Sequence, residues 1–174
     1  MGTVLDFVTL VGKSENMRRN ELLAAVLAEA RKAFALNTAW TQHGPEHWRQ
    51  VERNAIMLAE KTPGCDTVVA RIFALLHDCK RQNEGSDPEH GARAAAFAQE
   101  LHDRGVLGLD PGQLATLKFA MTHHNGGHVS DDPTIGVCWD ADRLDLPRVG
   151  TRPDAELMST KAGKEGSFRG QVSI

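Results

Sequence analysis

The sequence predicts an all-α protein that folds as a single bundle of about six helices. Apolar residues recur at helical spacing, strand-like alternation is nearly absent, and Ala, Leu, Glu and Arg dominate the periodic segments. The chain has 174 residues, 41% of them hydrophobic and 25% charged, which suits one globular domain. Four helix starts place a capping residue before proline: Gly44-Pro45, Asp87-Pro88, Asp110-Pro111 and Asp132-Pro133.

These signals locate each helix in turn. An Ala- and Leu-rich stretch forms the first helix, and the first ten residues offer a further short one. Pro45 opens the second helix, Asp66 caps the third, and Gly105 ends the fourth. The expected helices cover residues 15–36, 45–61, 66–79, 88–104, 111–124 and 133–146.

The same pattern predicts three parts in the chain. Residues 1–40 form a helical extension, residues 41–150 the main domain, and residues 151–174 a tail. After Met158 the tail is rich in Ser, Lys, Gly and Glu and offers little to bury. We therefore expect it to be partly flexible or to rest on a partner.

Charge and cysteine usage narrow the expected partners and compartment. The net charge is −3 and there is no basic stripe, so neither nucleic acid nor an anionic membrane is expected as a partner. Glu29 and Arg31 interrupt the apolar stretch from Leu22 to Ala28, which therefore cannot span a bilayer. The three cysteines show no paired spacing and no signal peptide is visible, which predicts a cytoplasmic protein. The Ala-rich helix around Ala28 also offers a surface for a homodimer.

His77 and Asp78 stand side by side at the end of the apolar run from Val68 to Leu76. Both are metal ligands, and both are costly to remove from water unless a charged group holds them. A divalent cation binds imidazole and carboxylate together, so this pair predicts one half of a metal site.

Two other helices aim similar groups inward. His47 lies in the first turn of its helix, in line with Val51 and Leu58, although a core histidine bonded to a backbone carbonyl explains the same pattern. Asp142 interrupts an apolar stripe after Trp139, and a buried aspartate needs a partner, either a cation or an arginine. Asp140 points the opposite way along this helix, and Asp145 lies where it supports Asp142 from one turn beyond.

Three more histidines are candidates for the same site. His90 lies in the first turn of its helix, in line with Ala94, where it either ligates a metal or packs the helix start. His124 continues the stripe of Leu117 and Met121, and His123 lies one step around the helix. The His123-His124 pair is either a polar helix end or a group facing the substrate.

The polar segment after Asp78 carries the remaining candidates. Lys80 and Arg81 either form a solvated basic helix end or neutralise the oxygens of a phosphoryl group. Glu84 lies in the loop that follows and is a candidate for positioning water, although loop glutamates commonly face solvent.

The order His47, His77-Asp78, Asp142 resembles the H…HD…D signature of the HD-domain metal-dependent phosphohydrolase superfamily. The segments His43–Trp48, Leu75–Asp78 and Trp139–Asp145 carry the resemblance, which extends from His43 to Gly150. The sequence lacks the Gly-Tyr-Pro element of the cyclic-dinucleotide branch and resembles the small stand-alone HD hydrolases.

The resemblance implies a bundle with about five core helices around a metal centre. The ligands by position would be His47, His77, Asp78 and Asp142. Branches that bind two or three metals use additional histidines, and His90, His123 and His124 fall where those would lie. The metal would be Mn, Fe, Co, Ni, Zn or Mg, with Mg fitting these ligands least well.

The expected reaction is hydrolysis of a phosphate ester or anhydride by metal-activated water. The substrate would be a small phosphorylated molecule, often a nucleotide in such proteins. His77 and Asp78 would ligate the metal, with Asp78 also orienting the water. Arg81, Lys80 and His123 or His124 would neutralise phosphoryl oxygens, and His90 would hold phosphate or a second ion.

Three other functions use the same residues. A non-catalytic nucleotide or phosphate sensor would bind its ligand in the same metal cavity. A purely structural metal would have a saturated coordination sphere and no adjacent cavity. Oxygenase chemistry at a di-iron site would use His90 and the His123-His124 pair.

Overall fold

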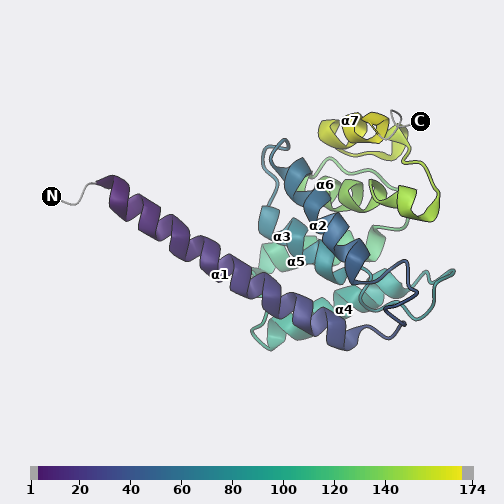
Figure 1. The fold of residues 1–174 in the computed structure, drawn as a ribbon, viewed down its shortest axis with the longest axis horizontal. Helices are drawn as coiled ribbons and strands as arrows, with labels where there is room; N and C mark the ends of the chain where they lie inside the picture. The colour runs from purple at the N-terminus through teal and green to yellow at the C-terminus, as the bar shows by residue number, and fades with distance from the viewer. Residues whose placement is uncertain (1–3, 170–174) are drawn as a thin grey trace.

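The computed structural model describes the backbone of residues 4–169 and the side chains of residues 14–167, and this part of the chain contains no strand. The predicted all-α fold is therefore confirmed (Figure 1). None of the described helices combines the length and apolarity needed to cross a bilayer. The α-helices are α1 (Val4–Ala33), α2 (Pro45–Ala59), α3 (Thr67–Leu76), α4 (His90–Asp103), α5 (Pro111–His123), α6 (Pro133–Arg143) and α7 (Lys161–Arg169), and two short 3₁₀ helices follow α6, η1 (Leu146–Val149) and η2 (Ala155–Leu157).

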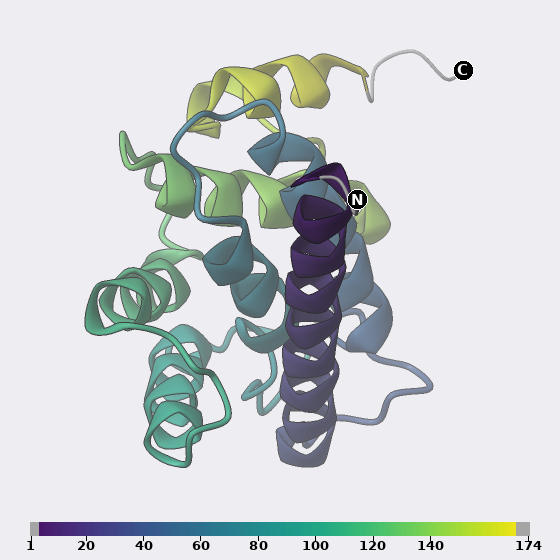
Figure 2. The same cartoon turned by 90° about the vertical axis from the view of Figure 1, so that its left-hand side faces the viewer.

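Helix α3 forms the centre of the bundle. Its residues from Val69 to Leu76 are almost entirely buried, except Arg71, which binds Glu52 on α2. Helices α1, α2, α5 and α6 all contact α3, while α4 pairs with α5 (Figure 2). A short helix that is apolar on nearly every side is stable only in such surroundings. The loop that follows α3 therefore starts in the middle of the protein, and it begins with His77.

The capping predictions hold at most helix starts. The side chains of Asp66 and Asp132 each accept two backbone N–H bonds, and Asp110 forms a capping box with Gln113. Helix α4 begins at His90 and not at Pro88, because the Asp87 carboxylate binds Arg93 and the backbone of residue 82 instead.

Other boundaries differ from the prediction. The two expected N-terminal helices are one continuous helix, α1, which ends at Ala33. Helix α3 ends at Leu76, where the chain turns to present the next two side chains. The homodimer, the cytoplasmic location and the division into three parts stay predictions.

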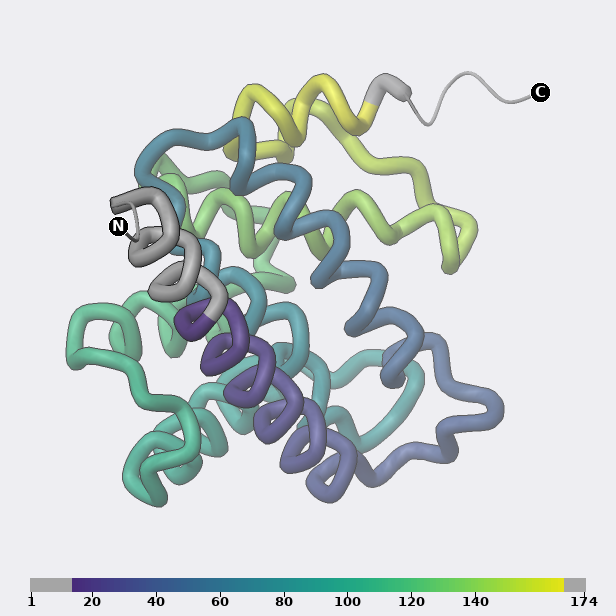
Figure 3. The backbone as a smooth tube through the Cα atoms, turned by 60° about the vertical axis from the view of Figure 1, so that its left-hand side comes forward, coloured from purple at the N-terminus to yellow at the C-terminus, as the bar shows by residue number. Residues whose placement is uncertain are grey.

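The segment after Met158 is more ordered than its composition predicts. Met158, Thr160 and Ser167 are buried, and α7 lies beside α6 (Figure 3). The buried carboxylate of Asp140 accepts the backbone N–H groups of Ser159 and Thr160 and so fixes this segment on α6. The expectation that these residues bury little is therefore wrong up to residue 167, and residues 170–174 lie outside the described residues.

Candidate metal centre

The predicted ligands His47, His77, Asp78 and Asp142 lie together at the centre of the bundle. They come from the first turn of α2, the end of α3 and the last turn of α6. His47 Nε2 lies 3.1 Å from His77 Nε2, 3.3 Å from Asp142 Oδ1 and 3.6 Å from Asp78 Oδ2. His77 Nε2 lies 3.6 Å from Asp142 Oδ1 and 3.8 Å from Asp78 Oδ2. We call these four residues the first cluster.

A second cluster, Asp78, His90 and His124, meets the other oxygen of the same aspartate. His90 Nε2 lies 3.1 Å and His124 Nε2 3.7 Å from Asp78 Oδ1, and the two Nε2 atoms are 2.8 Å apart. The close approach of α4 to α5 at Gly91 brings the two rings together, because a Cβ there would lie 2.2 Å from the carbonyl oxygen of Met121. Asp78 is therefore the residue that the two clusters share.

All four imidazoles have the same orientation. Each Nδ1 faces an acceptor: Asp145 Oδ2 at 2.7 Å from His47, Ala74 O at 3.1 Å from His77, Met121 O at 2.6 Å from His124, and Asp87 O next to His90. An Nδ1–H that donates to such an acceptor leaves the Nε2 lone pair free, as in metal-bound histidines. In this tautomer the Nε2 atoms of all four histidines point into the two clusters as potential ligands.

The donor set fits divalent metal ions. Ligand atoms about 2.0–2.2 Å from one shared cation are separated by roughly 3.0–3.5 Å, close to the spacing in the first cluster. The Nε2 atoms of His47 and His77 are 3.1 Å apart, and those of His90 and His124 are 2.8 Å apart. Two unprotonated nitrogens this close repel each other unless a proton or a cation lies between them. Within the described residues, the buried Asp78 Oδ1 accepts no hydrogen bond, which a cation would remedy.

The acidic groups of the site hold their charge strongly. Burial raises the pKa of Asp78, but the nearby imidazoles of His77, His124, His43 and His90 outweigh this effect, so the pKa lies well below its usual value. The same balance, with His47 and His77 as the partners, keeps the pKa of Asp142 well below its usual value. Both carboxylates are therefore ionised and available as ligands at neutral pH.

The pKa values of the imidazoles shift in different directions, depending on their neighbours. Burial lowers the pKa of His47, but hydrogen bonds to Asp142 and Asp145 outweigh this effect and raise the pKa to about 9. Burial dominates at His77 and lowers its pKa. At His124 burial is again opposed, here by the bond to Asp78, and the pKa is raised. Without a metal, His47 therefore carries a proton that a metal would have to displace.

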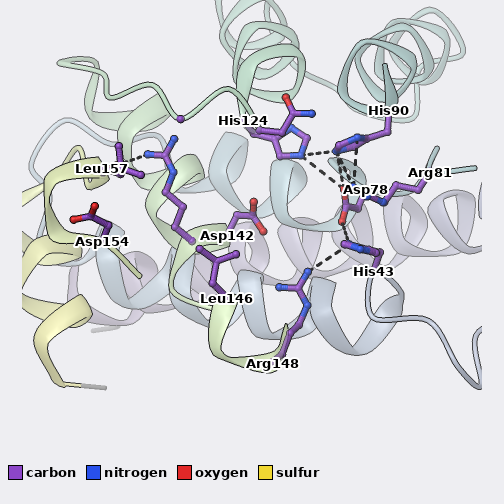
Figure 4. A pocket seen from close by; sticks show the side chains of 13 residues that line it. His43, Asp78, Arg81, His90, His124, Asp142, Leu146, Arg148, Asp154 and Leu157 are labelled. Atoms are coloured by element: carbon purple, nitrogen blue, oxygen red, sulfur yellow. Dashed lines mark hydrogen bonds and ion pairs between the residues drawn. The ribbon is translucent and has the colours of Figure 1, made fainter. Parts of the chain in front are cut away.

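A cavity of about 300 Å³ opens onto both clusters. Figure 4 shows the histidines and Asp78 at one end and Asp154 with Leu157 at the other. A volume of this size lies at the small end of ligand pockets. The lining residues are His43, Asp78, Arg81, His90, His124, Asn125, Gly127, Asp142, Arg143, Leu146, Arg148, Asp154 and Leu157.

Two basic groups of the cavity were not singled out from the sequence. His43 Nδ1 lies 3.0 Å from Asp78 Oδ2, and Arg148 Nη2 lies 3.4 Å from His43 Nδ1. Arg148 belongs to η1, and its Nε donates to the carbonyl of Gln42 at 2.8 Å. His43 precedes His47 by four residues, a spacing that could have pointed to it, but Arg148 lies in a short 3₁₀ turn whose geometry the sequence does not reveal.

The structure does not bring every predicted residue to the site. Arg81 lines the cavity, with Nη1 3.6 Å from Asp78 Oδ1, but Lys80 lies over the ring of Phe97 instead. His123 is exposed and packs against Phe119, so its predicted catalytic and phosphate-binding roles do not fit its position. Glu84 is also exposed and accepts the N–H of Gln42 outside the cavity.

One comparison with known proteins supports this fold. The structure is similar to that of a predicted HD superfamily hydrolase from an uncultured Thermotogales bacterium, with a TM-score of 0.64 and 29% sequence identity over 90% of this chain and 88% of that one. No protein-family model matches the sequence, and no curated protein does. This similarity supports an HD-domain fold for the chain, an all-helical bundle with a His/Asp centre. At the level of the superfamily, the similarity and the His/Asp centre support a metal-dependent hydrolase.

Proposed function

We propose that this protein hydrolyses a phosphate ester or anhydride of a small molecule, a nucleotide being one such substrate, with one or two divalent metal ions. One observation carries the proposal: the carboxylate of Asp78 lies between two imidazole clusters and faces a cavity lined by arginines. A bound cation would supply Lewis acidity and an activated water near neutral pH. Mn, Fe, Co, Ni and Zn suit nitrogen and carboxylate ligands, and Mg suits them less.

The side chains around the clusters can bind the phosphoryl group. Arg81 is buried next to Asp78, and its Nε has no hydrogen-bond partner among the described residues. Arg148 and His43 form the opposite edge of the same end of the cavity. In the proposed reaction, these groups orient phosphoryl oxygens and offset the charge that develops on them.

Other side chains keep the histidines in position. Asp145 accepts a hydrogen bond from His47 Nδ1 and so directs Nε2 to the first cluster. Phe73 stacks on the ring of His77 with the centroids 5.0 Å apart and shields it from solvent. Asp145 and Phe73 touch the ligands without lining the cavity, so we assign them positioning roles.

The cavity argues against a purely structural metal. A structural ion would be enclosed by its protein ligands, whereas Asp78 and Asp142 both line an open cavity. A non-catalytic sensor and a di-iron oxygenase remain the alternatives to a hydrolase. Both use the same ligands, so they are separated by what the metal-loaded protein does.

The proposal is tested by metal analysis of the purified protein combined with a phosphatase panel. The panel contains phosphate monoesters, diesters, pyrophosphate and nucleotides, each with Mn, Fe, Co, Ni, Zn or Mg and with a chelator. We expect metal-dependent hydrolysis of at least one of these substrates, detected as released phosphate or, for a diester, as released alcohol, and we expect it to be lost in His77→Ala. Binding of phosphorylated ligands without turnover by any metal form would favour the sensor, and substrate-dependent oxygen uptake with stoichiometric iron would favour the oxygenase.

A further inference from the structure

The wall of the cavity opposite the metal centre is formed by residues that are not among the predicted metal ligands. Asp154 and Leu157 line this end, and Leu146 lies between them and the first cluster (Figure 4). Asp154 and Leu157 belong to the C-terminal segment, defined here as residues 151–167. Since Arg81, His90 and His43 lie at the other end, a phosphoryl group bound there would direct its leaving group toward the C-terminal segment.

Helix α6 holds the C-terminal segment in place. Asp140 Oδ1 accepts the N–H of Ser159 at 2.8 Å, and Asp140 Oδ2 accepts both the N–H and the hydroxyl of Thr160 at 2.8 Å. Gly163 packs against the same carboxylate, where a Cβ would lie 2.2 Å from Oδ2. Asp142 follows Asp140 by two residues, so a single helix positions both a predicted metal ligand and the opposite wall.

Arg143 completes this attachment. Its guanidinium donates to the carbonyl oxygens of Leu157 and His128, and it lies over the ring of Trp139. Burial lowers the pKa of Arg143, and the nearby carboxylates of Asp140 and Asp142 only partly oppose this shift. Arg143 also lines the cavity, but its Nη atoms are taken up by the backbone carbonyls of Leu157 and His128, whereas Asp154 is an exposed carboxylate on the cavity wall.

Asp154 gives this end of the cavity a distinct chemistry. One of its oxygens accepts the N–H of Glu156 at 2.9 Å and so starts η2, which fixes the backbone on which the carboxylate stands. Leu146 and Leu157 supply apolar surface beside it. A carboxylate next to apolar walls favours hydroxyl or ammonium donors and repels a second phosphate.

We propose that Asp154 selects the leaving group, and that the substrate is a phosphate monoester whose alcohol carries hydroxyl or ammonium donors. This inference rests on the proposed hydrolase function and narrows it. A cavity of about 300 Å³ accommodates a phosphate with one compact organic group. Nucleoside diphosphates and triphosphates are poor substrates, because their additional phosphates would lie toward Asp154.

The test compares leaving groups in wild type and Asp154→Asn. Asparagine is nearly isosteric and caps as well as aspartate, so this variant keeps the start of η2 and removes only the charge. The matched control is Asp131→Asn, since Asp131 is exposed and lies outside the cavity lining. The probes are a ribonucleoside 5′-monophosphate, its 2′,3′-dideoxy counterpart, the corresponding diphosphate, and p-nitrophenyl phosphate, which lacks donors.

We expect wild type and Asp131→Asn to prefer the ribonucleoside monophosphate over the dideoxy compound by roughly tenfold in kcat/KM, mainly through KM. In Asp154→Asn this ratio should approach one, and the diphosphate should gain relative to the monophosphate. Thermal melting and metal content check that the variant is folded and loaded.

The outcomes separate the inference from the function on which it rests. Metal-dependent hydrolysis of p-nitrophenyl phosphate with the same donor preference in Asp154→Asn and wild type would overturn the role of Asp154 and leave the hydrolase intact. A wild-type preference for the diphosphate would do the same. Failure of the metal-loaded wild type to hydrolyse any of the four probes would reject the monoester hydrolase and the inference together.

Discussion

The two clusters around Asp78 differ in charge and in how their histidines are held. The first contains two carboxylates and two imidazoles, and a carboxylate, Asp145, anchors His47. The second contains two imidazoles that share Asp78, and backbone carbonyls anchor both of them. Among the described residues, the first cluster offers four candidate ligands, whereas the second offers three.

Asp78 therefore connects two sites that should differ in metal affinity. In the first cluster, the carboxylates of Asp78 and Asp142 would both balance the charge of a cation. In the second cluster, Asp78 is the one carboxylate, and it is shared with the first. An anchoring carboxylate also raises the basicity of a histidine more than a carbonyl does. We therefore expect the first cluster to bind metal more tightly, and the second to depend on Asp78 and on what occupies the cavity.

The largest effect should come from Asp78→Asn, which removes the shared ligand. Both clusters lose their common carboxylate, so we expect loss of bound metal and a decrease in turnover of at least ~10³-fold, more than the loss of one charge-stabilising group. Elemental analysis and phosphate release measure the two effects. Asp103→Asn, on the exposed end of α4, is the control and should match wild type. Retention of full activity would exclude Asp78 from the mechanism.

Replacing one histidine from each cluster tests their inequality. His47→Ala should lose the more tightly bound metal and nearly all turnover. His90→Ala should keep about one equivalent of metal while turnover falls, because the first cluster is intact. Metal content after gel filtration separates the two variants. Equal metal loss in both would show that the clusters bind as one unit, contrary to the comparison above.

The first cluster is also the more predictable of the two from sequence. His47 and Asp142 each lie on an inward stripe of a helix with a clear start, so helical periodicity was enough to direct both inward. The apolar run of α3 likewise indicated that His77 emerges inside the protein. Local regularity together with the HD resemblance is therefore sufficient to predict these ligands.

The errors lie where regular structure ends. His123 and Lys80 were assigned to the site, yet one residue rotates a helix by about 100°, and at a helix end the direction of a side chain depends on where the chain turns. Arg148 and the C-terminal segment were missed because they depend on contacts with distant residues. Thr160 reaches Asp140 across twenty positions, and no local pattern reports such a pairing.

Gly91→Ala should weaken the second cluster selectively. The new Cβ would meet the carbonyl oxygen of Met121 at 2.2 Å, so α4 must move away from α5 and carry His90 from His124. Overpacking of this kind costs about 1–3 kcal/mol of unfolding free energy. Chemical denaturation of the metal-free protein measures this, with Gly112→Ala in the exposed first turn of α5 as the control. An unchanged stability would show that the two helices are free to separate.

Asp145→Asn should weaken the first cluster without removing a ligand. Amide replacement of a carboxylate that anchors a metal-binding histidine typically costs roughly 10–100-fold in metal affinity or activity. Competition with a chromogenic chelator measures the affinity, again beside Asp103→Asn. The same change at the carbonyl-anchored histidines is not available, which makes Asp145 the most direct probe of how the two clusters differ. Wild-type affinity in this variant would mean that the anchor has no energetic role.

The smallest effect is a pH dependence of the metal-free protein. Asp142 and Asp145 raise the pKa of His47 to about 9 against its usual 6.5 despite burial. Because the folded state binds this proton more tightly, the contribution to stability is complete below about 6.5 and is lost as the pH rises through about 9. The pKa of Asp142 is depressed, so its contribution to stability is lost only at acid pH. It is therefore constant over the range in which His47 titrates.

Comparison of wild type with Asp145→Asn isolates the part of this contribution that comes from Asp145. Burial lowers the pKa of His77, and that histidine acts in the opposite direction, but the variant leaves its contacts in place, so its effect cancels in the difference. We expect the stability difference between the two proteins to be largest at about pH 6 and to shrink toward pH 9.5, as urea denaturation of chelator-treated samples would measure. A difference that stays constant across this range would show that Asp145 orients His47 without holding its proton.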